Sequence, residues 1–192
     1  MPNDISNSIV PISTTKTIVS ESNRQIVFQG MTHVGSEAFY NKVRKDIIKY
    51  KRQGFKVFYE GVTILTDSNL RPCSLTKNNT LIKQPSFLEH IDISTDINID
   101  KDYTAKHLYH KANCSPYSIV DIRTKYRTSK IRDYFASQVE SEKDMNLLKH
   151  ALKSTGNIYI LFGEDHQENF ISELLTKGKD AKLIKSSLSV SI

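Results

Sequence analysis

The sequence predicts an α/β protein in which helices flank a central sheet of mainly parallel or mixed strands. The first observation is a β-favouring run, an amphipathic helical pattern and a second β-favouring run that follow one another over 25–60. The second is a similar strand, glycine, histidine and helix over 157–178, so we expect two related strand–Gly-x-x-His–helix halves. The chain has 192 residues, 38% of them hydrophobic, and is long enough to bury a core without disulfides.

The first 24 residues do not share this pattern. They are polar, are interrupted by Pro11, and contain no basic stretch followed by an apolar core, so we expect a flexible or loosely docked arm and no secretory signal. Residues 25–192 then form a single domain. Cys73 and Cys114 are isolated, which indicates reduced thiols in a cytoplasmic protein. No run approaches the roughly 18 apolar residues that a membrane span needs.

The N-terminal unit has the clearest local pattern. Residues 25–28 are typical of a buried strand, and Ser36 is placed to cap a helix with Glu37 in its first turn. Gly54 would end this helix, and the next strand covers 55–59. The order strand, helix, strand predicts a right-handed crossover between parallel strands. The apolar face of the helix follows spacings of three and four at Phe39, Tyr40, Val43, Ile47 and Tyr50.

The middle of the chain, 63–102, has no clear period, although we expect short helices near Phe87 and over 102–110. Further on, two apolar stripes predict helix again, at Ile131, Tyr134, Phe135 and Val139 and at Leu147, Leu148, Ala151 and Leu152. The strongest strand of the chain covers 157–162. The helix after it has an apolar face of Phe170, Leu174 and Leu175.

The same short motif follows the first and the last of these strands. Gly30 precedes His33, and Gly163 precedes His166, each time just before a helix, while Glu60 ends the strand between them in sequence. Because ligands of α/β sheets bind at the carboxyl ends of the strands, we expect His33, Glu60 and His166 to converge. Two imidazoles and a carboxylate suit a divalent transition metal such as Mn, Co or Zn. Such a metal activates water for hydrolysis of an amide or an ester.

Other interpretations stay open for these residues. Each histidine can be a hydrogen-bonded loop residue, and Glu60 can cap the next segment, pair with a lysine, or serve as a general base beside the metal. Glu164 and Asp165 can supply oxygen ligands or favour the N-terminus of the following helix, and we prefer the helix. Arg132 is a candidate clamp for an anion or a transition state, or a surface arginine paired with a nearby carboxylate.

Two further features compete with this site. His107, His110 and Cys114 form a rival metal cluster, but a second pair at zinc-finger spacing is missing, so a solvated helix face is the expected alternative. The net charge of +6 is concentrated over 42–56 and 125–132. Since no recognised nucleic-acid module accompanies this charge, we do not expect a nucleic acid as the partner.

The two Gly-x-x-His motifs and the glutamate resemble the signature of the TraB/Tiki superfamily. This group includes GumN-type proteins and, more distantly, the erythromycin esterases and the haem-binding ChaN proteins. Residues 131–136 are similar to the family's Arg-Asn-x-x-Met-Ala element, with Asp133 at the asparagine position, and 98–103 is a looser match to its Asn-x-Asp segment. The resemblance covers about 25–185.

The resemblance implies an α/β fold of two related halves around one site, with His33, Glu60 and His166 as the metal-binding or catalytic group. Tiki proteins are described as metal-dependent peptidases, and the esterases as lactone hydrolases. We therefore expect a metal-dependent hydrolase of a peptide or a small-molecule ester, with Glu60 and Arg132 as candidate catalytic residues. The alternative is a non-catalytic binding or signalling module of the same fold that sequesters a peptide or haem.

Overall fold

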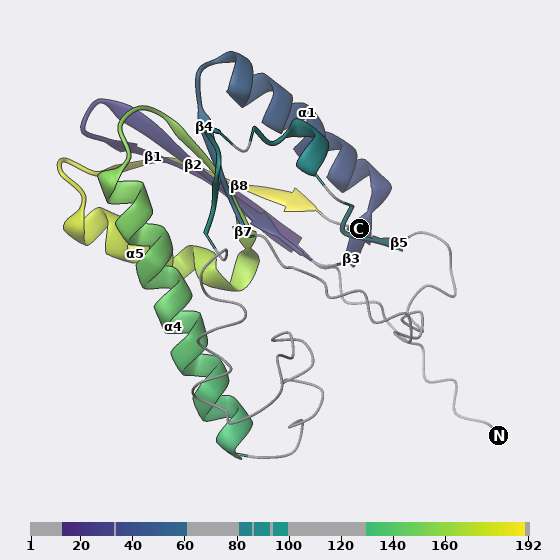
Figure 1. Ribbon diagram of the computed structural model, residues 1–192, viewed down its shortest axis with the longest axis vertical. Helices are drawn as coiled ribbons and strands as arrows, with labels where there is room; N and C mark the ends of the chain where they lie inside the picture. The colour runs from purple at the N-terminus through teal and green to yellow at the C-terminus, as the bar shows by residue number, and fades with distance from the viewer. Residues whose placement is uncertain are drawn as a thin grey trace.

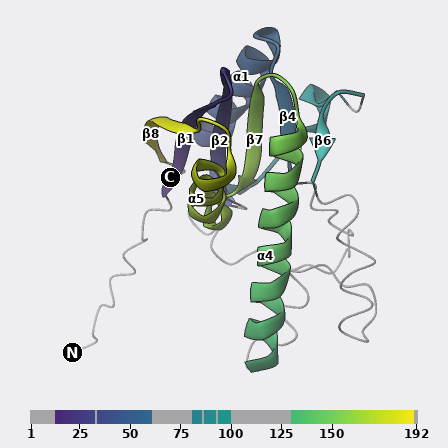
Figure 2. The same ribbon diagram turned by 90° about the vertical axis from the view of Figure 1, so that its left-hand side faces the viewer.

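A six-stranded sheet with helices on both faces forms the centre of the protein. Its strands lie in the order β6-β4-β7-β2-β1-β8 (Figure 1 and Figure 2). Helix α1 packs on one face, and helices α4 and α5 pack on the other. The predicted α/β class, with a mixed sheet flanked by helices, is confirmed. The computed structural model describes residues 13–32, 34–60, 81–85, 87–92, 94–99 and 130–190, and at 34, 81–83, 88, 130–140 and 190 it gives the backbone alone.

Four neighbouring strands of the sheet are parallel. Strand β2 (Arg24–Met31), helix α1 (Glu37–Arg52) and strand β4 (Lys56–Tyr59) form the predicted strand–helix–strand unit. Strand β7 (Ile158–Gly163) lies between β2 and β4 and pairs in parallel with both. Strand β6 (Ile97–Asn98) continues the parallel sheet beyond β4. The carboxyl ends of β2, β4 and β7 therefore lie at the same edge of the sheet.

The fifth strand of this sheet, β1, runs opposite to its two neighbours. Strand β1 (Ser13–Glu21) lies between β2 and β8 (Lys182–Val190) and pairs antiparallel with both. The turn from β1 to β2 has positive φ at both central residues, Ser22 and Asn23, which is what a two-residue hairpin with a type I′ turn requires. The expectation of a loosely docked arm is thereby corrected for 13–24, because β-branched residues and this turn place them in the sheet. Residues 1–12 lie outside the described residues.

Two clusters of buried side chains hold the layers together. On one face, the five predicted apolar positions of α1 are all buried, and the Ser36 hydroxyl accepts a hydrogen bond from the Phe39 amide at 3.2 Å. A short two-stranded sheet of β3 (Val34–Ser36) and β5 (Leu81–Lys83) lies beside the start of α1. The α1 stripe was thus predicted correctly, cap included.

The opposite face carries the two C-terminal helices. The second predicted apolar stripe belongs to a long helix, α4 (Lys130–Lys153), whose Leu147, Leu148 and Ala151 are buried, whereas Leu152 is exposed. After β7, a single 3-10 turn, η3 (Glu164–His166), leads into α5 (Gln167–Lys177). Another 3-10 turn, η2 (Leu88–His90), lies near Phe87 where a short helix was expected. No helix in the described parts of the chain is both long and apolar enough to cross a membrane.

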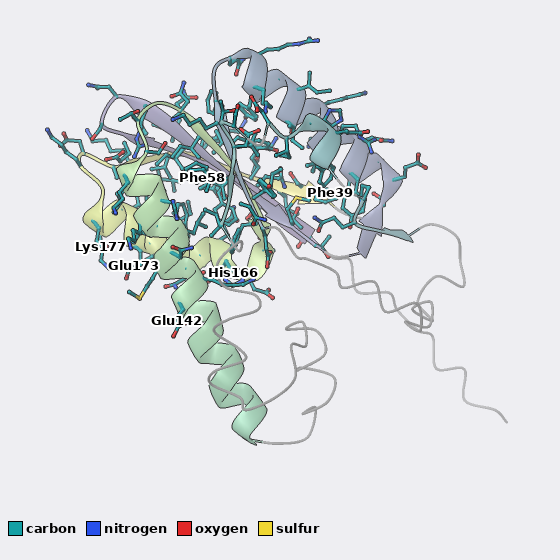
Figure 3. The ribbon with its side chains drawn as sticks, viewed as in Figure 1. Phe39, Phe58, Glu142, His166, Glu173 and Lys177 are labelled. Carbon is teal, nitrogen blue, oxygen red and sulfur yellow. The ribbon has the colours of Figure 1, made fainter. Side chains whose placement is uncertain are left out.

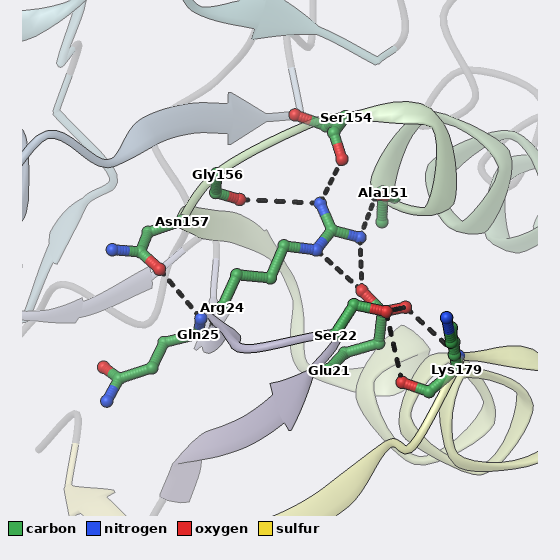
Figure 4. A network of polar contacts seen from close by, with 9 residues as sticks. All are labelled: Glu21, Ser22, Arg24, Gln25, Ala151, Ser154, Gly156, Asn157 and Lys179. Carbon is green, nitrogen blue, oxygen red and sulfur yellow. Dashed lines mark hydrogen bonds and ion pairs between the residues drawn. The ribbon is translucent and has the colours of Figure 1, made fainter.

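A network of polar contacts closes the end of the sheet at which the parallel strands begin (Figure 4). The Arg24 guanidinium binds the Glu21 carboxylate at 2.6 Å and also donates to the Ala151 carbonyl at 2.8 Å and to the Ser154 carbonyl. Both charged side chains are less than 10% exposed. The cation therefore binds carbonyl groups at the C-terminus of α4, where the helix dipole favours positive charge, and ties this helix to the β1–β2 turn.

Candidate functional site

Two of the three predicted site residues meet at the carboxyl ends of β4 and β7. Glu60 directly follows β4, and its amide donates to the Leu161 carbonyl at 3.0 Å, as a continued parallel pairing would. One of its carboxylate oxygens, Oε2, accepts a hydrogen bond of 3.2 Å from the amide of Gly163. The last residue of β7 thus fixes the side chain of the residue after β4.

His166 lies in the 3-10 turn after β7, at the edge of the sheet and beside α4 (Figure 3). Its Nδ1 atom is 2.7 Å from Oδ1 of Asp144 on α4, and the side-chain amide of Asn169 donates to the other Asp144 oxygen at 2.6 Å. The Phe162 ring meets the imidazole edge-on, with the centroids 5.0 Å apart. The contacts with Asp144 and Phe162 therefore hold the imidazole of His166 in one orientation.

Glu60 and His166 both come close to Gly163. A Cβ atom placed on Gly163 would lie 3.5 Å from Oε2 of Glu60, 3.2 Å from Cδ2 of His166 and 3.9 Å from Nε2 of His166. The acceptor oxygen of Glu60 and the second ring nitrogen of His166 are therefore both within 4 Å of one point. A side chain at position 163 would be tight only against Cδ2 of His166, at 3.2 Å.

A lysine neutralises the carboxylate at this site. Nζ of Lys143 lies 2.6 Å from Oε1 of Glu60, and its side chain is only 5% exposed. The same ammonium lies 5.7 Å from the centroid of the Phe162 ring, within the range of a cation–π contact. A buried carboxylate is costly without a partner, and Lys143 is that partner for Glu60.

The charges around His166 favour its protonated form. Burial lowers the pKa of His166, but the hydrogen bond and the charge of Asp144, together with the charge of Glu60, outweigh it, so that the pKa lies above its ordinary value. Lys143 acts in the opposite direction. The imidazole thus lies between two carboxylates and one ammonium.

The glycine of the first motif has a different role from that of the second. A Cβ atom on Gly30 would come within 1.5 Å of Oε2 of Glu164. The Glu164 carboxylate occupies the space that a side chain at position 30 would need. It accepts hydrogen bonds from the backbone amide and the hydroxyl of Thr15 on β1, at 2.9 and 2.8 Å. Glu164 and Asp165 lie in the first turn of η3, as the preferred interpretation expects, and the Thr15 contacts of Glu164 are a second role that the sequence did not indicate. Its carboxylate joins the end of β7 to β1.

Several predicted residues lie outside the described part of the chain. His33 is one, and so is the rival cluster of His107, His110 and Cys114. For Arg132 the structure gives only the position in the backbone of α4. Within the described ranges, no three His, Cys, Asp or Glu side chains form a cluster that could hold a metal ion.

The described residues nevertheless fit part of a metal site. His166 presents Nε2 while Asp144 holds its other nitrogen, and Glu60 supplies a carboxylate oxygen near the same point. These are two of the three donors expected from the sequence. A polar hollow of about 360 Å³ lies elsewhere, lined by Ser20, Ser22, Asn23, Lys179, Asp180 and Lys182, and contains none of them.

The contribution of α4 to the site was missed at the level of the sequence. Asp144 and Lys143 lie three and four residues before Leu147, so charged residues occupy the buried stripe of a helix. A charged side chain at an apolar position of a helix is informative, because it requires a partner inside the protein. This signal is present in the sequence.

No protein-family model, no curated protein and no solved structure matches this chain.

Proposed function

We propose that this protein is a hydrolase of peptide or ester bonds that uses a divalent transition metal, Mn, Co or Zn, at the carboxyl ends of β4 and β7. The observation that carries the proposal is the approach of Glu60 and His166 to the space beside Gly163, with His166 held by Asp144. A metal-bound histidine usually has its other ring nitrogen hydrogen-bonded to a carboxylate or a carbonyl.

In this proposal, His166 and His33 supply nitrogen ligands, and Glu60 supplies an oxygen ligand or acts as the general base. The bound metal would acidify water and polarise the substrate carbonyl. The protein's own contribution is orientation: Asp144 fixes the ring of His166, and the Gly163 amide fixes one oxygen of Glu60. Arg132 is proposed as the clamp for the developing negative charge.

We further propose that the two halves of the domain are related and that the chain belongs to the TraB/Tiki superfamily. In support, Gly30 pairs with Phe162 and Met31 pairs with Gly163, so the motif glycines lie one residue apart in register on adjacent parallel strands. The departures from the family pattern are Asp133 in place of asparagine and the acidic pair Glu164-Asp165. The Thr15 contacts give Glu164 a structural reason to be acidic.

Elemental analysis of the purified protein tests the proposal. We expect one transition metal per chain, lost in His166→Ala and in His33→Ala. The matched control is His150→Ala, because His150 lies on α4 outside the site. Thermal unfolding of each variant shows whether it is folded. Metal content that is equal in all four folded proteins would rule out the metal site.

Lys143 supports a second candidate, a module of the same fold that binds a peptide or haem without turnover. Its ammonium already neutralises Glu60, and an ion pair of this kind is stable without a metal. Ligand binding by equilibrium dialysis, together with no hydrolysis of peptide and ester libraries in added Mn, Co or Zn, would favour this candidate. Hydrolysis that depends on Glu60, measured with Glu60→Gln, would favour the enzyme.

A further inference from the structure

Strand β8 forms one end of the six-stranded sheet (Figure 2). It pairs with β1 on one side, and in the part of the chain that the structure describes, no strand pairs with its other side. The strand has nine residues and carries three large apolar side chains in contact with solvent: Leu183 is 53% exposed, Ile184 60% and Leu188 67%. The unpaired backbone groups of an edge strand are a template for pairing with another chain, and charged side chains such as Lys182 and Lys185 restrict the registers in which a partner can pair.

Two of these side chains emerge on the same face of the sheet. Leu188 pairs with Thr15, whose hydroxyl binds Glu164, and Leu183 pairs with Val19, which belongs to the core under α4 and α5. Paired residues of antiparallel strands point to the same face. Leu183 and Leu188 therefore both lie on the face that α5 covers, although five residues separate them. Residues an odd number of positions apart normally point to opposite faces of a sheet. Here they point to the same face because Ile184 is an extra residue in a β-bulge.

We propose that β8 is an interface at which two copies of this chain pair antiparallel about a two-fold axis, joining their sheets edge to edge. The occupant is a second copy because the strand is complementary to itself. With Ser186 placed opposite the Ser186 of the second copy, Lys185 lies opposite a Ser187. The two-residue bulge of Leu183 and Ile184 then lies opposite a single Leu188.

Beyond the bulge in this register, Lys182 lies opposite a Ser189. Every lysine of the strand thus faces a serine, every exposed apolar side chain faces an apolar one, and the faces agree with those set by β1. A shift that places Lys185 opposite the second Lys185 would bring like charges together. A two-fold interface also closes on itself, so it gives a dimer and not a fibre.

Sedimentation equilibrium of the purified chain at several concentrations tests the pairing. We expect twice the mass of the chain at high concentration, and a shift to the monomer in Leu188→Lys. The control is Met145→Lys, because Met145 on α4 is exposed to the same extent, 67%, and lies away from β8. A chain that is monomeric at all concentrations overturns the proposal, and so does a dimer that Leu188→Lys leaves unchanged.

Cross-linking tests the register. In a background with Cys73→Ser and Cys114→Ser, we expect Ser186→Cys to form an intermolecular disulfide on mild oxidation, because opposed residues of antiparallel strands lie within disulfide reach. Ser172→Cys, at an exposed position of α5, is the control and should not cross-link to the same extent. Equal cross-linking of the two variants would overturn the proposed register. A dimer of the Ser186→Cys variant that yields no peptide cross-linked through position 186 would do the same.

Discussion

Asp144 lies 2.7 Å from His166, and this contact joins the long helix α4 to the loop that leaves β7. Asp144 uses its second oxygen to accept from Asn169, so both oxygens are engaged, and the carboxylate is largely buried. The orientation of the imidazole is therefore set by a residue on another element.

Under the proposed function, Asp144→Asn should lower both metal affinity and hydrolysis about 10- to 100-fold, the loss typical for removing a carboxylate that orients a metal-binding histidine. Competition with a chelator gives the affinity, and steady-state kinetics give kcat/KM. Asn169→Ala is the comparison, since it removes a partner of Asp144 and leaves the contact with His166; we expect a smaller loss. If Asp144→Asn and the unmodified chain bind metal equally, Asp144 does not position His166.

Gly30→Ala should destabilise the fold by about 2 kcal/mol, because the added methyl group would displace the Glu164 carboxylate from Thr15. Urea unfolding measures this change. The same substitution in a Glu164→Ala background should cost much less, since the displaced group is then absent. Additive effects of the two substitutions would show that the two positions do not interact.

Glu21→Gln should reduce the stability of the fold at neutral pH and make that stability depend less on pH. Burial raises the pKa of Glu21. Hydrogen bonds from Arg24 and Ser22 and the charge of Arg24 lower it by more than burial raises it, so the pKa lies below its ordinary value of 4.5. The stabilisation is therefore complete above that value and is lost as the pH falls through the lower pKa of the folded state.

Thermal unfolding from pH 7 to pH 3 measures this dependence. The difference in stability between the unmodified chain and Glu21→Gln should be largest near neutral pH and should shrink in acid. A difference that stays constant over this range would show that the Glu21 carboxylate has the same pKa in the folded and unfolded states.

Tyr159→Phe should leave stability unchanged or raise it by about 1 kcal/mol. Tyr159 is fully buried in β7, where its ring packs against Tyr50 at 4.5 Å, and its hydroxyl makes no hydrogen bond to any described residue. Burying a hydroxyl without a partner costs free energy, and phenylalanine keeps the ring. The control is Tyr40→Phe, which should destabilise, because the Tyr40 hydroxyl donates to the Thr32 carbonyl at 2.8 Å.

The local parts of the fold could be predicted from the sequence, because periodicity and capping act over a few residues. The stripe and cap of α1 and the strand and glycine of β7 are of this kind. The place of β7 between β2 and β4 could not, since strand order depends on packing between distant segments. Strand β8 was missed because its serines and lysines do not give the alternation of a half-buried strand.

The candidate site also contains residues that the sequence indicated and residues that it did not. Glu60 and His166 were identified because they follow strands, and the carboxyl ends of parallel strands share an edge. Lys143 and Asp144 come from the middle of a helix, and their partners are 83 and 22 residues away in sequence. Their positions in the apolar stripe indicate that both side chains are buried, but which distant residues they contact depends on how α4 lies across the sheet, and no local pattern determines this.

The attachment of α4 by Arg24 has a consequence for the distant site. Arg24 binds the Ala151 carbonyl, two helical turns beyond Asp144, and so fixes how far α4 can slide along its own axis. A slip of one residue would move Asp144 by about 1.5 Å, which is more than a preorganised constellation tolerates. Through α4, the hairpin at one end of the sheet is thus linked to the positions of Asp144 and His166 at the other.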